Sequence, residues 1–136
     1  MTAARTRRGL RLLLTIVSIV MLVAGSLAVV FGASSVLGAG DVTADVDSEM
    51  RFYAVWYVVA GAFLLRAAKR VESETWTIRL ITAAFFVAGC SRILSWVAVG
   101  RPHIFQVILM VIELILPLVV IPWQASVARR ATSSAR

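Results

Sequence analysis

Residues 104–121 read IFQVILMVIELILPLVVI, and Glu113 is the one charged side chain in this run. A helix of about 20 apolar residues spans the hydrocarbon core of a bilayer, since each residue adds about 1.5 Å. The run therefore predicts a membrane-spanning helix over about residues 104–123. Pro117 removes a backbone donor from this helix and predicts a bend in it.

Three further apolar runs cover about residues 12–32, 52–68 and 76–99. The chain is 60% hydrophobic and 15% charged, with a mean hydropathy of +0.91, whereas soluble domains are about 25% charged. Its 136 residues suffice for four spans with short connections. We expect an all-α membrane protein, a single transmembrane domain over residues 1–136. Its fold would be an antiparallel bundle of four helices, and residues 124–136 would form a flexible basic tail.

The basic residues predict the orientation. On one side of the predicted spans lie Arg5, Arg7, Arg8, Arg11, Arg66, Lys69, Arg70, Arg79, Arg129, Arg130 and Arg136, whereas the other side has Arg51 and Arg101. Lys and Arg are retained on the cytoplasmic side, so both termini are expected in the cytoplasm. A net charge of +7 in this arrangement fits the anionic membrane surface and not nucleic acid. We expect a multi-pass membrane protein, and the resemblance described below implies a bacterial inner membrane.

Stripes of small residues predict how the spans pack. Helices in lipid gain little from apolar burial, so their close approach depends on small side chains. Three stripes are present, at Ser18, Gly25 and Gly32, at Ala54, Gly61 and Ala68, and at Ala84, Ala88, Ser91, Ser95 and Ala98. The fourth span has no such stripe, so much of its surface is expected to face lipid or a partner subunit. The stripes suggest a tight bundle.

Arg92 and Glu113 each lie inside an apolar run, where an ionisable residue costs about 2.5–3.5 kcal/mol on insertion scales. Counted from the Gly100–Pro102 turn, Arg92 lies ~12 Å and Glu113 ~16 Å along their helices. Side chains lean toward the N-terminus of their helix, so these two lean toward each other. The spacing therefore predicts an arginine–carboxylate pair between the third and fourth spans.

The role of this pair has several interpretations. It is a structural clamp between two helices, a polar site for a lipid headgroup or small anion, a centre of proton chemistry, or a contact to another subunit. Gln106 and Ser95 lie outward of the pair on the same two helices. Together with Glu49 and Arg51 at the outer mouth, they are candidates to line a polar cleft. For Glu49 and Arg51 the alternative is a solvated interfacial pair.

No motif for catalysis, metal binding or a cofactor is found. Cys90 is the single cysteine, so an intrachain disulfide and a CxxC pair are excluded, and it is interpreted as a packing residue. His103 has no second ligand beside it and is interpreted as a turn residue. We therefore predict no catalytic residues, no metal, no cofactor and no enzyme activity.

Several motifs in the chain resemble those of a known family. They are Glu49-x-Arg51-Phe, Arg92-Ile-x-Ser95 followed by Gly100-x-Pro102, and Glu113-Leu. They are similar to the uncharacterised bacterial four-helix membrane family catalogued as domain of unknown function 4345, over about residues 12–122. The resemblance implies four spans and draws attention to these charges, but it implies no reaction. Family members tend to carry an acidic residue beside the glycine, where this chain has Arg101.

Three functions are considered on this basis. The first is an accessory subunit of a larger envelope complex, for example a lipid transporter of the mammalian-cell-entry type, contacted through the fourth span. The second is an independent protein that binds or transports a lipid or small amphiphile at Arg92 and Glu113. The third is a small intramembrane enzyme with Glu113 as acid or base, which the nearby Arg92 disfavours because it stabilises the ionised carboxylate. Expected partners are membrane lipids and protein subunits.

Overall fold

The computed structural model describes residues 2–133 of the chain. Four long helices make up most of it: α1 (Thr2–Phe31), α2 (Ala44–Ala68), α3 (Thr75–Val99) and α4 (Ile104–Ser133). A short 3-10 helix, η1 (Gly32–Ser35), follows α1. Each of the four long helices is long and apolar enough to cross a membrane, and residues 2–133 contain no strand. The prediction of an all-α protein with four membrane-length helices is confirmed.

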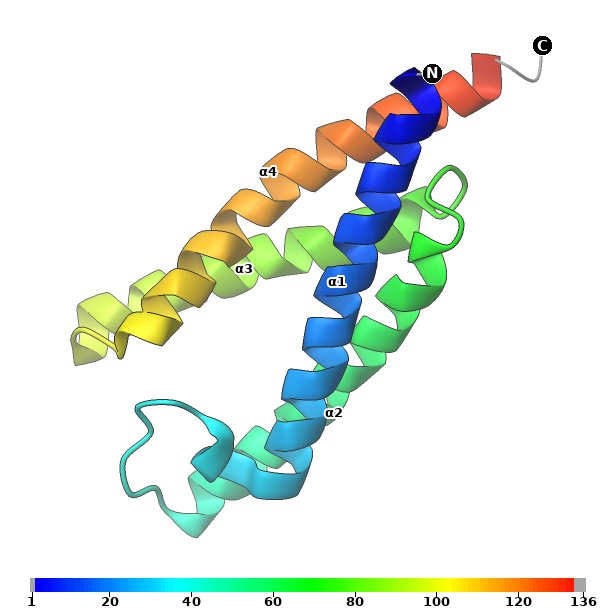
Figure 1. Ribbon diagram of the computed structural model, residues 1–136. Helices are drawn as coiled ribbons and strands as arrows, with labels where there is room; N and C mark the ends of the chain where they lie inside the picture. The colour runs from blue at the N-terminus through cyan, green and yellow to red at the C-terminus, as the bar shows by residue number, and fades with distance from the viewer. Residues whose placement is uncertain (1, 134–136) are drawn as a thin grey trace.

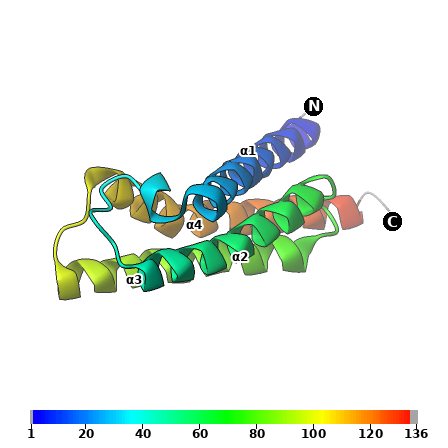
Figure 2. The same cartoon turned by 90° about the horizontal axis from the view of Figure 1, so that it is seen from below.

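The four helices form two pairs. Figure 1 shows α1 beside α2 and α3 beside α4, with both chain ends and the α2–α3 loop at the same end of the molecule. Contacts between the two pairs are far fewer than contacts within each pair. The α1–α2 pair and the α3–α4 pair diverge toward the end of the molecule that lies away from the chain ends. At that end the loop after η1 reaches across toward the start of α4 (Figure 2). The molecule is therefore less uniformly packed than the tight bundle that the small residues suggested.

The α1–α2 pair is held together where side chains are small. A Cβ atom at Gly25 would lie 2.7 Å from Cγ2 of Val58, and one at Gly61 would lie 3.0 Å from Cβ of Met21. Carbon atoms pack at about 3.5–4.0 Å, so larger side chains would push the helices apart. Ala54 is buried in the same interface. The predicted stripes of the first two spans thus face each other.

The α3–α4 pair uses one glycine that lies outside the predicted stripe. A Cβ atom at Gly89 would lie 2.8 Å from Cγ of Leu114 in α4. The stripe itself has a different environment: Ala84 and Ala88 line a cavity beside α2, and Ser91 is exposed. The small residues of α3 therefore leave space next to α2 instead of bringing two helices into contact.

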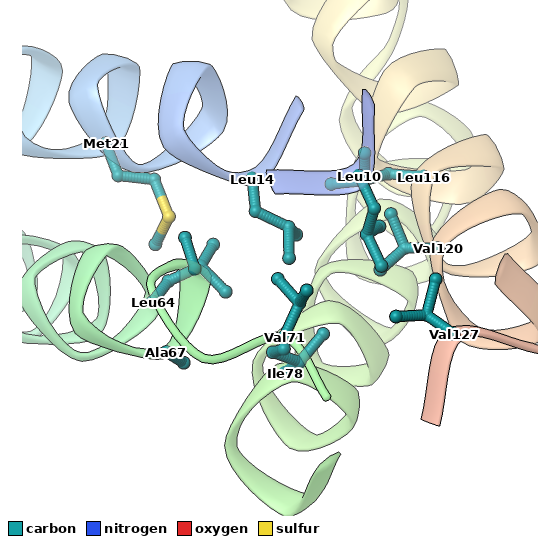
Figure 3. Packing of buried hydrophobic residues seen from close by; sticks show 11 residues of the cluster. Leu10, Leu14, Met21, Leu64, Ala67, Val71, Ile78, Leu116, Val120 and Val127 are labelled. Carbon is teal, nitrogen blue, oxygen red and sulfur yellow. The ribbon is translucent and has the colours of Figure 1, made fainter. Parts of the chain in front are cut away.

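The main apolar cluster lies at the end that carries both termini. It unites Leu10, Leu14, Met21, Leu64, Ala67, Ala68, Val71, Ile78, Leu116, Val120 and Val127. Figure 3 shows Leu14 of α1, Val71 of the α2–α3 loop and Ile78 of α3 pointing toward one another, with Val120 and Val127 of α4 nearby. All four helices contribute, so this cluster joins the two pairs through van der Waals packing.

A buried glutamine ties α4 to the α2–α3 connection within this end. The side-chain nitrogen of Gln124 donates to the carbonyl oxygen of Val71 at 3.3 Å and to Oγ1 of Thr75 at 2.8 Å. Its oxygen accepts from Nε of Arg79 at 3.0 Å. Gln124 is fully buried, and buried polar groups persist where they are hydrogen-bonded. Nearby, the indole nitrogen of Trp123 donates to the carbonyl of Thr6 at 3.1 Å.

The segment predicted as a flexible tail differs in the structure. Helix α4 continues past Pro117 and Pro122 and ends at Ser133. Gln124 and Val127, both beyond the predicted end of the span, are buried. Their contacts with the α2–α3 connection and the apolar cluster stabilise the extra turns, and composition alone does not reveal such contacts. Residues 134–136 of the predicted tail lie outside the described residues.

Helix α2 also begins earlier than the apolar run that predicted it. The run starts at about residue 52, whereas the helix starts at Ala44. Thr43 precedes it in an extended conformation, and its hydroxyl oxygen accepts from the backbone N–H of Val46 at 3.4 Å. Asp45 and Asp47 lie in the first turn, where the helix dipole favours negative charge. The acidic loop of the sequence is thus partly the N-terminal turns of α2.

Candidate functional site

Arg92 on α3 and Glu113 on α4 form a bidentate ion pair. Nε of Arg92 donates to Oε2 of Glu113 at 2.7 Å, and Nη2 donates to Oε1 at 3.1 Å. Nη1 of Arg92 donates to the side-chain oxygen of Gln106 at 2.9 Å. Two parallel bonds between a guanidinium and a carboxylate are a strong and directional arrangement. The structure thus brings together three of the four residues predicted for the intramembrane site.

The positions of these residues on their helices explain the contact. Gln106 and Glu113 are seven residues apart, so they lie on the same face of α4, two turns from each other. Arg92 lies on α3, and its long side chain reaches both of them from the facing helix. The contact therefore follows from the turn at Gly100, which sets the register between α3 and α4.

The two partners differ in exposure. The side chain of Glu113 is 9% exposed, whereas that of Arg92 is 37% exposed. Glu113 therefore lies inside the molecule with its charge compensated by Arg92. The side chain of Arg92, in contrast, is partly accessible and lines two cavities.

The first cavity has a volume of about 460 Å³ and lies between α2 and α3. Along α3 it runs from Leu80 to Arg92, a length of about 18 Å at the helical rise per residue. Most of its wall is apolar or aromatic, including Trp56 and Phe85, and Arg92 and Glu113 are its charged lining residues. The cavity is thus an elongated apolar space with the ion pair at one end of its α3 wall.

Tyr57 is the third polar side chain near this end. It lines the cavity, packs edge-on against Phe85 with 6.3 Å between ring centroids, and interacts electrostatically with both Glu113 and Arg92. Its hydroxyl makes no hydrogen bond within residues 2–133. Tyr57 was not predicted from the sequence, since an aromatic residue in an apolar span does not indicate that charged residues of other helices lie nearby.

The second cavity, of about 480 Å³, lies between the α1–α2 loop and the α3–α4 turn. Arg92, Ser95 and Gln106 line it from the two helices, and residues 36–39 line it from the loop. Ser95 is exposed and makes no hydrogen bond to Arg92, so it borders the cavity without joining the ion pair. At Gly38 the α1–α2 loop passes close to the α3–α4 turn. The φ angle of Gly38 is +85°, and a Cβ atom there would lie 2.5 Å from Cβ of His103 in the turn.

The two predicted outer charges, Glu49 and Arg51, line neither cavity. Nε of Arg51 donates to Oδ2 of Asp47 at 2.7 Å, and its Nη1 donates to two carbonyl oxygens in the last turns of α1 at 2.8 and 2.9 Å. Oδ1 of Asp47 accepts from the backbone N–H of Ala33 at 2.7 Å. Arg51 and Asp47 thus cap the C-terminal end of α1, where carbonyls lack partners in the helix. Glu49 is exposed.

Asp47 was not predicted as a partner of Arg51, although its spacing of four residues from Arg51 indicates a contact on a helix. Residues four apart on a helix are neighbours, and Asp47 and Arg51 have this spacing and opposite charges. The signal required α2 to begin before residue 47, and the apolar run alone did not indicate that. The capping side chains stabilise two further turns at the start of α2. Asp47 and Arg51 therefore lie one turn apart on the same helix and can pair.

Within residues 2–133, no group of three His, Cys, Asp or Glu side chains lies close enough together to hold a metal ion. Cys90 is partly buried in α3. The chemistry of the site therefore rests on one ion pair, one amide and one phenol.

A family model described as domain of unknown function 4345 matches residues 9–124. The chain belongs to this family. The match includes Arg92, Gln106 and Glu113 and reaches into each of the four long helices, so the resemblance seen in the sequence is confirmed. No curated protein and no solved structure matched the chain. The four apolar helices are compatible with a small membrane protein, and the description of the family names no activity.

The ion pair of this family member predicts a specific pattern of stability. Arg92→Met leaves the charge of buried Glu113 unpaired and is expected to lower the free energy of unfolding by about 3–5 kcal/mol. Glu113→Met is expected to cost less, because Arg92 is 37% exposed and keeps its bond to Gln106. The double variant removes both charges and is expected to regain most of this loss. Equilibrium unfolding in mixed micelles, followed by circular dichroism, measures the three values.

Arg101→Met is the matched control, because Arg101 is an exposed arginine near the same turn. It is expected to unfold like the unaltered protein. If the double variant loses as much free energy of unfolding as the two single variants together, Arg92 and Glu113 do not stabilise each other and the prediction is wrong.

Proposed function

We propose that this protein binds a long-chain amphiphile inside the membrane, in the cavity between α2 and α3. One observation carries the proposal: an elongated apolar cavity has an arginine–carboxylate pair at one end of its α3 wall. Binding cavities for small molecules typically measure about 300–1,000 Å³ and are apolar with a few placed polar groups, and the volume of about 460 Å³ lies in this range. A chain along the apolar wall leaves its head group beside Arg92.

The walls of the cavity support an apolar chain. Ala84 and Ala88 contribute small side chains from α3, which leaves room beside the helix. Trp56 and Phe85 provide broad apolar surfaces on either side. Trp56 is 61% exposed, so this wall of the cavity is accessible from outside the protein, and a ligand dissolved in lipid can reach it.

We place the four helices across a bacterial inner membrane in antiparallel order, with both termini in the cytoplasm. The excess of basic residues near the termini and the α2–α3 connection supports this orientation. Arg7 pairs with Glu72 there, which links the start of α1 to that connection. A cytoplasm-specific fluorescent reporter is expected to be bright when fused to either terminus, and a dark fusion at either end would reverse or break the assignment.

Photo-labelling tests the binding cavity. The full chain in phosphatidylcholine nanodiscs is exposed to a diazirine-bearing long-chain alcohol, and labelled residues are mapped by mass spectrometry. Label is expected to concentrate on residues that line the α2–α3 cavity. Ala84→Phe fills the cavity and is expected to abolish most of this labelling.

Ala83→Phe is the matched control, because Ala83 is the adjacent exposed residue and does not line the cavity. It is expected to keep the labelling pattern of the unaltered chain. Even labelling around all four helices, or equal labelling of the two variants, would refute the binding proposal.

A second candidate is an accessory subunit of a larger membrane complex, for example a lipid transporter. The outer face of α4 favours it: Ile108, Ile112 and Ile115 are 50%, 51% and 52% exposed and form one apolar stripe. Purification from native membranes in a mild detergent is expected to recover a larger complex, and a chain that migrates alone counts against this role.

A further inference from the structure

The charges beside the cavity between α2 and α3 are balanced. Arg92 contributes one positive charge and Glu113 one negative charge, and Gln106 is neutral. Among residues 6–133, whose side chains the structure describes, no other charged side chain lines this cavity. A ligand that adds a third charge would place it, uncompensated, in a low-dielectric space, which is strongly unfavourable.

The same cavity end retains unused hydrogen-bonding capacity. A guanidinium has five N–H donors, and Arg92 uses three of them on Glu113 and Gln106. The hydroxyl of Tyr57 adds another donor without a partner in residues 2–133. Glu113 lines the cavity too, and a carboxylate has about four acceptor sites, of which Arg92 occupies two.

Donors and an acceptor therefore lie side by side at a site with no net charge. A hydroxyl group both donates and accepts, so it can donate to Glu113 while it accepts from Arg92 or Tyr57. An ester or ketone oxygen only accepts and uses part of this arrangement. A carboxylate or phosphate head only accepts as well, and it adds a negative charge close to Glu113.

From this we infer that the head group of the bound amphiphile is an uncharged hydroxyl, held by Arg92, Glu113 and Tyr57, and that anionic lipids are rejected. The inference rests on the proposed binding function and specifies its ligand class. The ion pair then acts as a selectivity device: Glu113 cancels the attraction that Arg92 alone would exert on anions.

Competition against the diazirine-bearing alcohol tests this inference. The competitors share one chain length and differ in their heads: alcohol, methyl ester, carboxylate and phosphate. In nanodiscs at pH 7, the alcohol is expected to displace the probe at a mole fraction about tenfold below those of the two anions. The methyl ester is expected to lie between them, since it offers an acceptor but no donor.

Glu113→Gln removes the negative charge and keeps the side-chain size, so Arg92 becomes unbalanced. In this variant the carboxylate and phosphate are expected to compete better than the alcohol. An unchanged order of competitors in folded Glu113→Gln protein would overturn the role assigned to the charge balance.

Tyr57→Phe provides a test that does not disturb the ion pair, because the hydroxyl has no partner to lose. The variant is expected to need about two to ten times more alcohol for displacement, the range for one neutral hydrogen bond. Tyr53→Phe is the matched control, since Tyr53 lies one helical turn before Tyr57 in α2, lines the same cavity and is 63% exposed. Equal behaviour of the two variants would remove Tyr57 from the head-group site.

The outcomes separate the two proposals. If the probe labels the cavity but the anions compete best in the unaltered protein, the hydroxyl inference fails and the binding function stands. If the probe never concentrates in the cavity, the binding function itself fails. A diacylglycerol competitor, which carries the same hydroxyl on two chains, distinguishes single-chain alcohols from membrane glycerides as the source of the ligand.

Discussion

The contact between Arg92 and Glu113 constrains the whole α3–α4 pair. A charge buried alone in an apolar helix pair is costly, so each partner is tolerated because the other lies within 2.7 Å. Two N–H groups of Arg92 donate to the two carboxylate oxygens of Glu113. A third N–H group of Arg92 donates to Gln106, which lies two turns earlier on α4. This geometry sets which faces of α3 and α4 meet. It also leaves the Arg92 side chain partly accessible, where it lines both cavities.

The α1–α2 pair is held in a different way. Gly25, Ala54 and Gly61 allow the backbones to approach, and Arg51 with Asp47 caps the end of α1. Among the described residues, no ion pair links α1 to α2 in the middle of this interface. Each pair is thus stabilised internally, and the apolar cluster with Gln124 joins the pairs at one end. The cavity between α2 and α3 follows from this division, because the pairs are not packed along their full length.

Much of this was predictable from the sequence where the signal was local or periodic. Apolar runs predicted the helices, and the count from Gly100 predicted the contact between Arg92 and Glu113. The small residues seven apart predicted close packing, and the structure shows that those of α1 and α2 face each other. Polar contacts between elements were harder to predict, because Asp47 and Gln124 lie beyond the apolar runs and bond to other parts of the chain. Tyr57 was not predictable, since its proximity to the pair depends on how α2 lies beside α3 and α4.

By itself, the sequence determined that this chain forms four membrane-length helices and that Arg92 and Glu113 lie at similar depths. Hydropathy, helical rise and turn position depend on neighbouring residues and so are local properties. Only the tertiary structure decided that Arg51 pairs with Asp47, that Tyr57 lies near the ion pair and that a cavity separates α2 from α3. These features depend on how the two helix pairs lie against each other. In lipid, apolar burial scarcely distinguishes such arrangements, so contacts between particular side chains select one.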